Sequence, residues 1–156
     1  MQITKLEEKD IEEISSLALD LYRKFDAMDE ADKLDEPNFK EKMIEELKEF
    51  IQKDNNLLLT ATEDGKIIGY IRGIIKTRHP EFKIKKEGYI QECYINQEHR
   101  NKGIGKSLAK QILKWFNENS ITFITVSIYH SDIEANDFWK KIGFIEYNKT
   151  LKLGGK

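Results

Sequence analysis

The chain has 156 residues, of which 35% are charged, and its formal net charge is −2. This length predicts a single domain, residues 1–156, with an ordinary hydrophobic core. The near balance of charge excludes a whole-protein attraction to nucleic acid or to anionic membranes. The only cysteine, Cys93, excludes an internal disulfide, and the first thirty residues lack the apolar run of a signal peptide. No apolar segment approaches the roughly 20 residues that cross a bilayer, and we expect a cytoplasmic protein without membrane contact.

The N-terminal third of the chain predicts a strand and two amphipathic helices. Residues 1–6 alternate in polarity and fit a short strand. Asp10 then precedes apolar residues at helical spacing, namely Ile11, Ile14, Leu17, Ala18, Leu21, Tyr22 and Phe25. The polar residues 26–38 break this pattern. A second helix starting near Pro37 places its apolar face at Phe39, Met43, Ile44, Leu47, Phe50 and Ile51.

The rest of the chain predicts strands interleaved with helices. Asp64 and Gly65 separate two β-branched runs within residues 57–77, which is typical of a tight hairpin. A polar connection at 77–88 leads to a strand at 88–95, a helix over 104–116, a strand at 121–129, a short helix at 131–142 and a closing strand at 144–153. The order β-α-α-β-β-β-α-β-α-β predicts an α/β (α+β) fold whose central antiparallel strands run into two strand–helix units.

The stretch EHRNKGIGKSL, residues 98–108, places two glycines where the third long helix begins. A helix N-terminus offers unpaired N–H groups and partial positive charge, which suit a phosphate or diphosphate. Arg100, Lys102, Lys106 and Ser107 add charge and a hydroxyl. The P-loop spacing fails because Arg100 stands where its first glycine should be, and the dinucleotide fingerprint fails because only two glycines fit. A tight strand-to-helix turn without a ligand remains an alternative.

Read with their flanks, residues 88–147 resemble the GNAT superfamily of acetyl-CoA-dependent N-acetyltransferases. The likeness rests on YIQECYINQEHRNKGIGKSLAKQILKWF and ITVSIYHSDIEANDFWKKIGFIEY. It implies a mixed, mostly antiparallel central sheet flanked by helices, with acetyl-CoA (coenzyme A) in a gap between the strand at 88–95 and the strand at 122–129. The implied pyrophosphate ligands are the amides of Arg100, Asn101, Lys102, Gly103, Ile104, Gly105 and Lys106, with Ser107 nearby. Cys93, Tyr94 and Ile95 would bind the pantetheine arm through their backbone.

The resemblance places the thioester close to Glu92 and Cys93. An amine of pKa near 10 is protonated at neutral pH, so a base must take a proton before attack. Glu92 is the candidate for this base, and the alternatives are an exposed strand residue or an ion pair. Many relatives have a tyrosine that protonates the departing thiolate where this chain has Trp139. Tyr94, Tyr129 and His130 are substitutes, and we take Tyr129 as the candidate.

The short helix at 131–142 places Asp132, Ala135, Asn136 and Trp139 on one face. The resemblance implies that this face, with Asp132, Asn136 and Trp139, lines the cofactor. The alternatives are that Asp132 is an N-cap and that Trp139 and Phe138 are core aromatics.

The acceptor is expected to be the primary amine of a small molecule or a peptide. The acidic connection 26–36 would attract a cationic acceptor such as a polyamine, an aminoglycoside or a lysine-rich peptide, unless it is a solvated loop. The basic connection 72–86 lacks the interleaved aromatics that favour nucleic acid, and the isolated histidines predict no metal site. Dimers are common in the family, so a homodimer is an expectation. The alternative function is a non-catalytic acyl-CoA-binding sensor module on the same fold.

Overall fold

The structure is a computed structural model that describes residues 1–154. Its helices and strands are β1 (Gln2–Lys5), α1 (Ile11–Met28), α2 (Glu36–Phe50), β2 (Asn56–Glu63), β3 (Lys66–Thr77), β4 (Lys86–Ile95), α3 (Ile104–Glu118), β5 (Ile124–Val126) and α4 (Ile133–Ile142). Short 3-10 turns precede α1, α2 and α3 at Glu8–Asp10, Glu30–Asp32 and Gln97–His99. The expected order is present up to α4.

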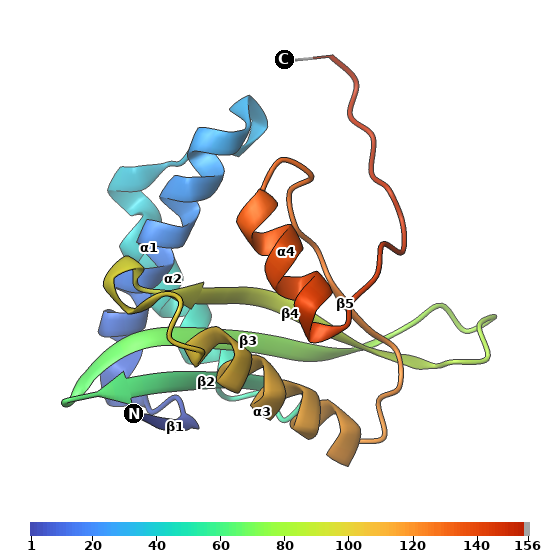
Figure 1. Cartoon of the computed structure of the whole chain (residues 1–156), viewed down its shortest axis with the longest axis horizontal. Helices are drawn as coiled ribbons and strands as arrows, with labels where there is room; N and C mark the ends of the chain where they lie inside the picture. Colours follow the sequence, from blue (N-terminus) through green and yellow to red (C-terminus); the bar gives the residue numbers. More distant parts are fainter. Residues whose placement is uncertain (155–156) are drawn as a thin grey trace.

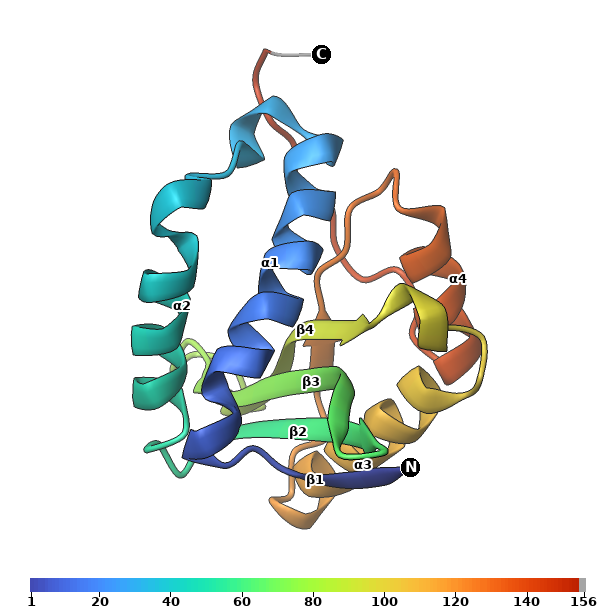
Figure 2. The same cartoon turned by 90° about the vertical axis from the view of Figure 1, so that its left-hand side faces the viewer.

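One sheet forms the centre of the molecule, with strand order β1-β2-β3-β4-β5. Neighbouring strands run antiparallel, except that β4 and β5 run parallel. Helices α1 and α2 lie side by side over one face of the sheet, whereas α3 and α4 pack against the other face (Figures 1 and 2). The β2–β3 hairpin turns at Asp64 and Gly65, both with positive φ. The predicted fold class is therefore confirmed.

Each face of the sheet has its own hydrophobic core, and alternation along the strands supplies both. On β3, Tyr70 is buried under α1 and α2 whereas the adjacent Ile71 is buried under α3. Strand β4 alternates in the same way until its pairing with β3 shifts between Arg72/Glu92 and Gly73/Ile90, which leaves Gln91 as an extra residue. Such a bulge exchanges the two faces for the residues that follow it. Residue 92 consequently belongs to the α1–α2 face.

Strands β4 and β5 separate soon after they pair. Their ladder joins only Gly88, Tyr89 and Ile90 to Ile124, Thr125 and Val126. Beyond Ile90, β4 continues to Ile95 along β3, and no residue of the described chain pairs with its other edge. That edge has no strand partner there and can pair with an extended ligand.

The closing strand expected at 144–153 is not formed, which corrects the predicted element order at its end. Phe144 packs against the core, and its N–H donates to the Trp139 carbonyl. The alternating apolar residues that suggested a strand remain largely exposed, namely Ile145, Tyr147, Leu151 and Leu153. A strand needs a ladder partner. The neighbouring β5 is only three residues long and offers this segment little edge to pair with.

Candidate functional site

Gly103 is the residue at which α3 begins, and its conformation explains why it is glycine. It is the N-cap of α3 with φ of 79°, and a Cβ placed there would meet nothing within 4 Å. Asn101, two residues earlier, also has a positive φ of 60°. Within residues 1–154, the amides of residues 102–106 carry no hydrogen bond, and Ser107 is the first to close a turn, onto the Gly103 carbonyl. The turn thus presents unpaired N–H groups at an open helix N-terminus.

Gly105 serves a different purpose from Gly103. A Cβ at this position would lie 3.2 Å from the Phe138 ring and 3.7 Å from the Ile95 side chain. The missing side chain therefore allows α4 to pack against the first turn of α3. The sequence predicted that both glycines let the backbone approach an anion. For Gly105 the structure adds a packing reason.

The charged and polar side chains around this turn divide into engaged and free groups. The Arg100 Nε donates to the Ile95 carbonyl at 3.0 Å, and its guanidinium lies 3.5 Å from the Glu134 carboxylate. The Ser107 hydroxyl donates back to the Gly103 carbonyl at 3.1 Å. Lys102 and Lys106 are exposed, whereas Ile104 is buried and can contribute only its backbone. The lysines and the amides are thus the groups ready for an anion.

Along the unpaired edge of β4, Cys93, Tyr94 and Ile95 lead from the centre of the sheet to this turn. Burial raises the pKa of the Cys93 thiol to about 12, so the thiol stays protonated and is a poor nucleophile. The Tyr94 ring lies on the α1–α2 face of the sheet, and the Arg100 Cζ lies 5.5 Å from the centre of this ring. These side chains leave the backbone edge of β4 as the surface available to a pantetheine-like chain.

Glu92 lies at the centre of a buried hydrogen-bond network. Its side chain is only 4% exposed. Oε1 accepts from the Tyr22 hydroxyl at 2.8 Å and from the Arg72 Nη2 at 2.5 Å, and Oε2 accepts from the Tyr70 hydroxyl at 2.8 Å. The alternative of an exposed strand residue is therefore wrong, and the alternative of an ion pair is present. A catalytic role for Glu92 stays a prediction.

Arg72 links this network to α2. Its Nη1 donates to the Glu46 Oε1 at 2.6 Å, and the Arg72 side chain is 3% exposed. Burial acts to lower the pKa of Arg72, but the carboxylates of Glu92 and Glu46 outweigh it and raise the pKa. Burial and the charge of Glu92 raise the pKa values of both Tyr22 and Tyr70, so these hydroxyls remain neutral donors.

Sequence reasoning missed Tyr22, Tyr70 and Arg72 as partners of Glu92. One signal was available, because Arg72 is the only charged residue within the buried part of the run IIGYIRGII. A buried charge needs a partner of opposite charge. The partner's position on β4 depends on the bulge, which no sequence pattern revealed.

The start of α4 uses its polar residues for local structure. The Asp132 Oδ1 accepts from the Ala135 N–H at 3.1 Å, which confirms the N-cap prediction, and its Oδ2 receives the Lys24 ammonium at 2.8 Å. The Asn136 amide nitrogen donates to the carbonyls of Tyr129 at 3.1 Å and Asp132 at 2.7 Å. Trp139 is 5% exposed. Its ring packs against Phe138 and Phe144, which favours the alternative of a core aromatic over a cofactor contact.

Tyr129 connects the loop before α4 to the connection between α1 and α2. Its hydroxyl donates to the Asp32 carboxylate at 2.5 Å, and its ring lies 5.3 Å from that of Phe25. Burial and the charge of Asp32 raise the pKa of Tyr129. The hydroxyl proton that Tyr129 would give to a leaving group is thus engaged in a hydrogen bond to Asp32.

Most carboxylates of the acidic connection between α1 and α2 form ion pairs with neighbouring residues. Asp29 binds Lys152, Asp35 binds Lys42, Glu36 binds Arg23, and both Asp26 and Glu30 lie near Lys33. The aspartates also accept backbone N–H groups, at Leu34 for Asp26 and at Ala31 for Asp29. Asp26 and Glu30 share one lysine, and Asp32 accepts only from the neutral Tyr129, so the connection is held by ion pairs and keeps negative charge.

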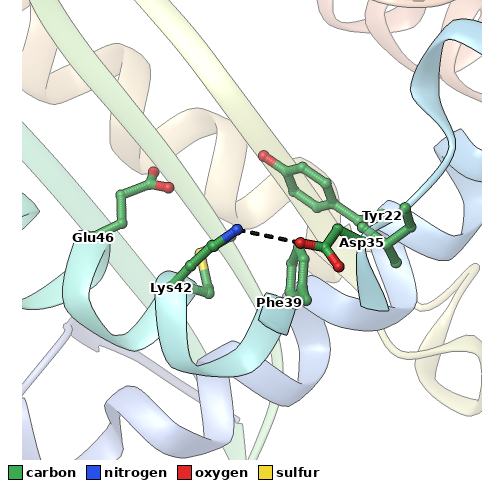
Figure 3. Close-up of a pocket in the computed structure, with 7 residues that line it drawn as sticks. Tyr22, Asp35, Phe39, Lys42 and Glu46 are labelled. Atoms are coloured by element: carbon green, nitrogen blue, oxygen red, sulfur yellow. Dashed lines mark hydrogen bonds and ion pairs between the residues drawn. The ribbon is translucent and has the colours of Figure 1, made fainter. Parts of the chain in front are cut away.

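A cavity of about 170 Å³ lies between this connection and the Glu92 network. It is lined by Tyr22, Leu34, Asp35, Phe39, Lys42, Met43 and Glu46 (Figure 3). Tyr22 belongs to both features, because its ring lines the cavity while its hydroxyl binds Glu92.

Among residues 1–154, no group of three or more histidine, cysteine, aspartate or glutamate side chains is placed to hold a metal ion. In the same part of the chain, none of the helices has the length and apolar character needed to cross a membrane.

Comparisons with known proteins concern the family and the fold. The model of the acetyltransferase (GNAT) family matches residues 18–144. The fold resembles a mutant of the BH1408 protein from Bacillus halodurans, with a TM-score of 0.87, 19% identity and 100% of both chains covered. No match was found among curated proteins.

Two aminoglycoside acetyltransferases also share the fold. The apo 6'-N-acetyltransferase AAC(6')-IG from Acinetobacter haemolyticus has a TM-score of 0.77 and 18% identity over 100% of this chain and 99% of that one. The N-acetyltransferase AAC(6')-Iy in complex with CoA has a TM-score of 0.81 and 13% identity over 99% of this chain and 94% of that one. At these identities the likeness is one of fold.

Proposed function

The chain belongs to the acetyltransferase (GNAT) family, whose members use acetyl-CoA, and from this premise we propose that it transfers an acetyl group directly to a primary amine. The observation that carries the proposal is the row of unpaired amides at the start of α3. This row comes one short turn after the unpaired edge of β4 along the chain. A helix N-terminus suits a pyrophosphate, and a free strand edge suits the amide-bearing pantetheine arm.

The residues present fit this cofactor. The amides of residues 102–106 would hold its pyrophosphate, with Lys102 and Lys106 as counter-charges. Arg100 would join them by leaving its contact with the exposed carboxylate of Glu134. The backbone of Cys93, Tyr94 and Ile95 would pair with the pantetheine amides. When bound, acetyl-CoA would supply the acetyl thioester, and the protein's own part would be to position the amine and to accept its proton.

Glu92 is the proposed proton acceptor. Three donors hold its carboxylate group in place. The same donors occupy both oxygens, so a proton reaches Glu92 through a neighbour or after one donor moves away. Tyr22 is the suitable neighbour, because its hydroxyl bonds to Glu92 and its ring lines a cavity.

Tyr129 is the proposed donor to the departing thiolate. It can fulfil this role once its hydroxyl leaves Asp32. A thiolate leaves readily and also accepts protons from water, so we expect Tyr129→Phe to lower turnover by less than tenfold.

The proposed acceptor is the amine of a small molecule. Ion pairs along the connection between α1 and α2 reduce the acidic rim that would attract a polycationic acceptor, although they do not remove it. The aminoglycosides named for two structural neighbours, amino-acid-like amines and polyamines all remain within the proposed class.

The experiment that tests this function is a thiol-release assay. The full chain is incubated with acetyl-CoA and separate pools of small amines, aminoglycosides, amino acids and peptides, and free coenzyme A is measured. Release that depends on one pool, with a product heavier by one acetyl group, supports the proposal. The sensor alternative predicts that acetyl-CoA raises the melting temperature while no pool releases thiol. No thermal shift at saturating acetyl-CoA would contradict both.

A further inference from the structure

Segment 145–153 carries a large share of the exposed apolar side chains. Of the nine large apolar side chains that are exposed within residues 1–154, four belong to this segment, namely Ile145, Tyr147, Leu151 and Leu153. Their exposed fractions run from 65% at Tyr147 to 105% at Leu153. Figure 1 shows the segment leaving the end of α4 and running along the outside of the molecule. Monomeric proteins rarely leave so many neighbouring apolar side chains in water, so this segment is a candidate contact surface.

The segment has the pattern of a strand and no strand partner inside the described chain. Its apolar residues stand at odd positions, and polar residues stand at the even ones, namely Glu146, Asn148, Thr150 and Lys152. Within residues 1–154 its main chain forms no backbone–backbone hydrogen bond. The neighbouring β5 is too short to pair with it. A strand with unpaired edges is a template for another strand.

Two side chains attach the segment to the rest of the molecule. The Tyr147 ring lies 5.3 Å from the Phe123 ring, and the Lys152 Nζ lies 2.5 Å from the Asp29 carboxylate. The Lys152 side chain is 50% exposed. An ion pair with such exposure contributes little to stability, so Lys152 can exchange Asp29 for another carboxylate.

The sequence of the segment is complementary to itself when two copies run antiparallel with Lys149 opposite Lys149. On the apolar face, Ile145 then lies opposite Leu153 of the second copy, and Tyr147 lies opposite Leu151. On the other face, Glu146 meets Lys152, and Asn148 meets Thr150.

Other registers lose this match. A shift by two residues puts Lys149 opposite Tyr147 or Leu151 and separates Glu146 from Lys152. A shift by one residue puts apolar side chains opposite polar ones. In the matched register the only like charges that face one another are the two Lys149 side chains on the two-fold axis.

From these observations we propose that segment 145–153 is a contact surface for a second copy of this chain, with the two segments paired as an antiparallel ribbon about a two-fold axis at Lys149. The same surface serves both copies, so assembly closes at a dimer. A ribbon with so few residues from each copy is smaller than the interface of a permanent dimer, which takes roughly 20–30 residues a side. The dimer is therefore reversible. This inference does not rest on the proposed function.

The first test is sedimentation equilibrium of the full chain without acetyl-CoA. We expect a monomer–dimer equilibrium with a dissociation constant of about 1–100 µM. Leu151→Asp replaces an apolar contact by a carboxylate at two places in the dimer, and it is expected to raise this constant about tenfold or more. The matched control Ile133→Asp makes the same kind of change at a 74% exposed residue of α4 outside the segment, and it is expected to leave the constant unchanged.

A charge swap tests the register. Glu146→Lys puts lysine opposite lysine, Lys152→Glu puts glutamate opposite glutamate, and each is expected to weaken the dimer about threefold or more. The double variant restores both pairs with reversed signs and is expected to recover the wild-type constant. Asp29 cannot cause this recovery, because it repels the glutamate that Lys152→Glu introduces. Lys140→Glu, at an exposed position of α4, is the control for a change of net charge.

Cross-linking tests the axis directly. Two residues 149 face one another in this register, so Lys149→Cys is expected to join two copies by a disulfide under mild oxidation. Asn148→Cys faces Thr150 and is expected to give little cross-link. The wild type controls for its own thiol, Cys93.

Three results would overturn the inference. They are a monomer at every concentration up to about 1 mM, a dimer whose dissociation constant Leu151→Asp leaves unchanged, and a charge swap without recovery. The second result would assign the dimer to another surface. None of them bears on acetyl transfer, which the thiol-release assay tests separately.

Discussion

The start of α3 and the surroundings of Glu92 are built in opposite ways. The turn at 98–108 is local, because its amides, glycines and lysines come from one short stretch of chain. The Glu92 network joins four elements, since Tyr22 comes from α1, Glu46 from α2, Tyr70 and Arg72 from β3 and Glu92 from β4. A local site can be recognised from its sequence, whereas a site assembled across elements depends on registers that the sequence does not display.

The local site predicts the largest effect of a single substitution. Gly103→Glu puts a carboxylate where the unpaired amides point, and like charge opposes a pyrophosphate there. We expect the rise in melting temperature caused by acetyl-CoA to disappear in a thermal-shift measurement.

Gly65→Glu is the matched control for this substitution. Gly65 has a φ of 77° and Gly103 one of 79°, and neither would crowd a Cβ within 4 Å. Both substitutions therefore impose a similar backbone cost, but Gly65 lies in the β2–β3 turn and not among the residues that carry the unpaired amides. We expect Gly65→Glu to keep the acetyl-CoA shift. Loss of the shift in both variants would mean that strain, and not the anion site, explains the result.

The assembled site predicts the next largest effect, on turnover. Glu92→Gln keeps the shape of the side chain and removes the charge, so we expect turnover to fall by about 100-fold or more, as for loss of a general base. Acetyl-CoA binding, measured by thermal shift, should persist. The variant also removes the Glu92 charge, 4% exposed, that faces the buried Arg72, which keeps its pair with Glu46. Breaking a buried pair costs about 3–5 kcal/mol of stability.

Temperature separates the two consequences of Glu92→Gln. The assay is run well below the melting temperature of the variant, with folding checked by circular dichroism. Arg72→Met serves for comparison, since it disturbs the same pair and keeps the carboxylate. Full turnover in folded Glu92→Gln would assign Glu92 to structure alone.

A smaller effect is expected where α4 begins. Asp132→Ala removes both the N-cap bond to Ala135 and the ion pair with Lys24. Loss of a cap costs about 1–2 kcal/mol, which chemical denaturation can measure. Asp132→Asn keeps a capping oxygen and should recover most of this loss. If the two variants lose equal stability, the Lys24 ion pair and not the cap supplies the contribution.

The same contrast explains what the sequence could predict. Helical periodicity, the Asp64–Gly65 turn and the glycines of α3 are local signals, and they led to the fold, the N-cap at Asp132 and the unpaired amides. The bulge at Gln91 is not such a signal. Without it Glu92 would face α3, so its partners could not be inferred from alternation along β4. The unformed strand at 144–153 shows the converse. Its residues alternate as in a strand, but the neighbouring β5 is too short to pair with them.

The smallest predicted effect concerns Cys93, which lies on β4 between Glu92 and the turn at the start of α3. Its thiol packs toward the α3 side, where burial raises the pKa from 9.0 to about 12. The unfolded chain then loses the thiol proton at a lower pH than the folded chain does. Stability from this source is complete below pH 9 and is lost as the pH rises toward 12. Between pH 8 and pH 10 the loss is expected to be about 1 kcal/mol. Denaturation of wild type and Cys93→Ala at both pH values isolates it, because the tyrosines of the Glu92 network titrate in both chains alike. An equal pH dependence in the two proteins would show that the thiol is not desolvated and that the β4 edge is open to water on the α3 side as well.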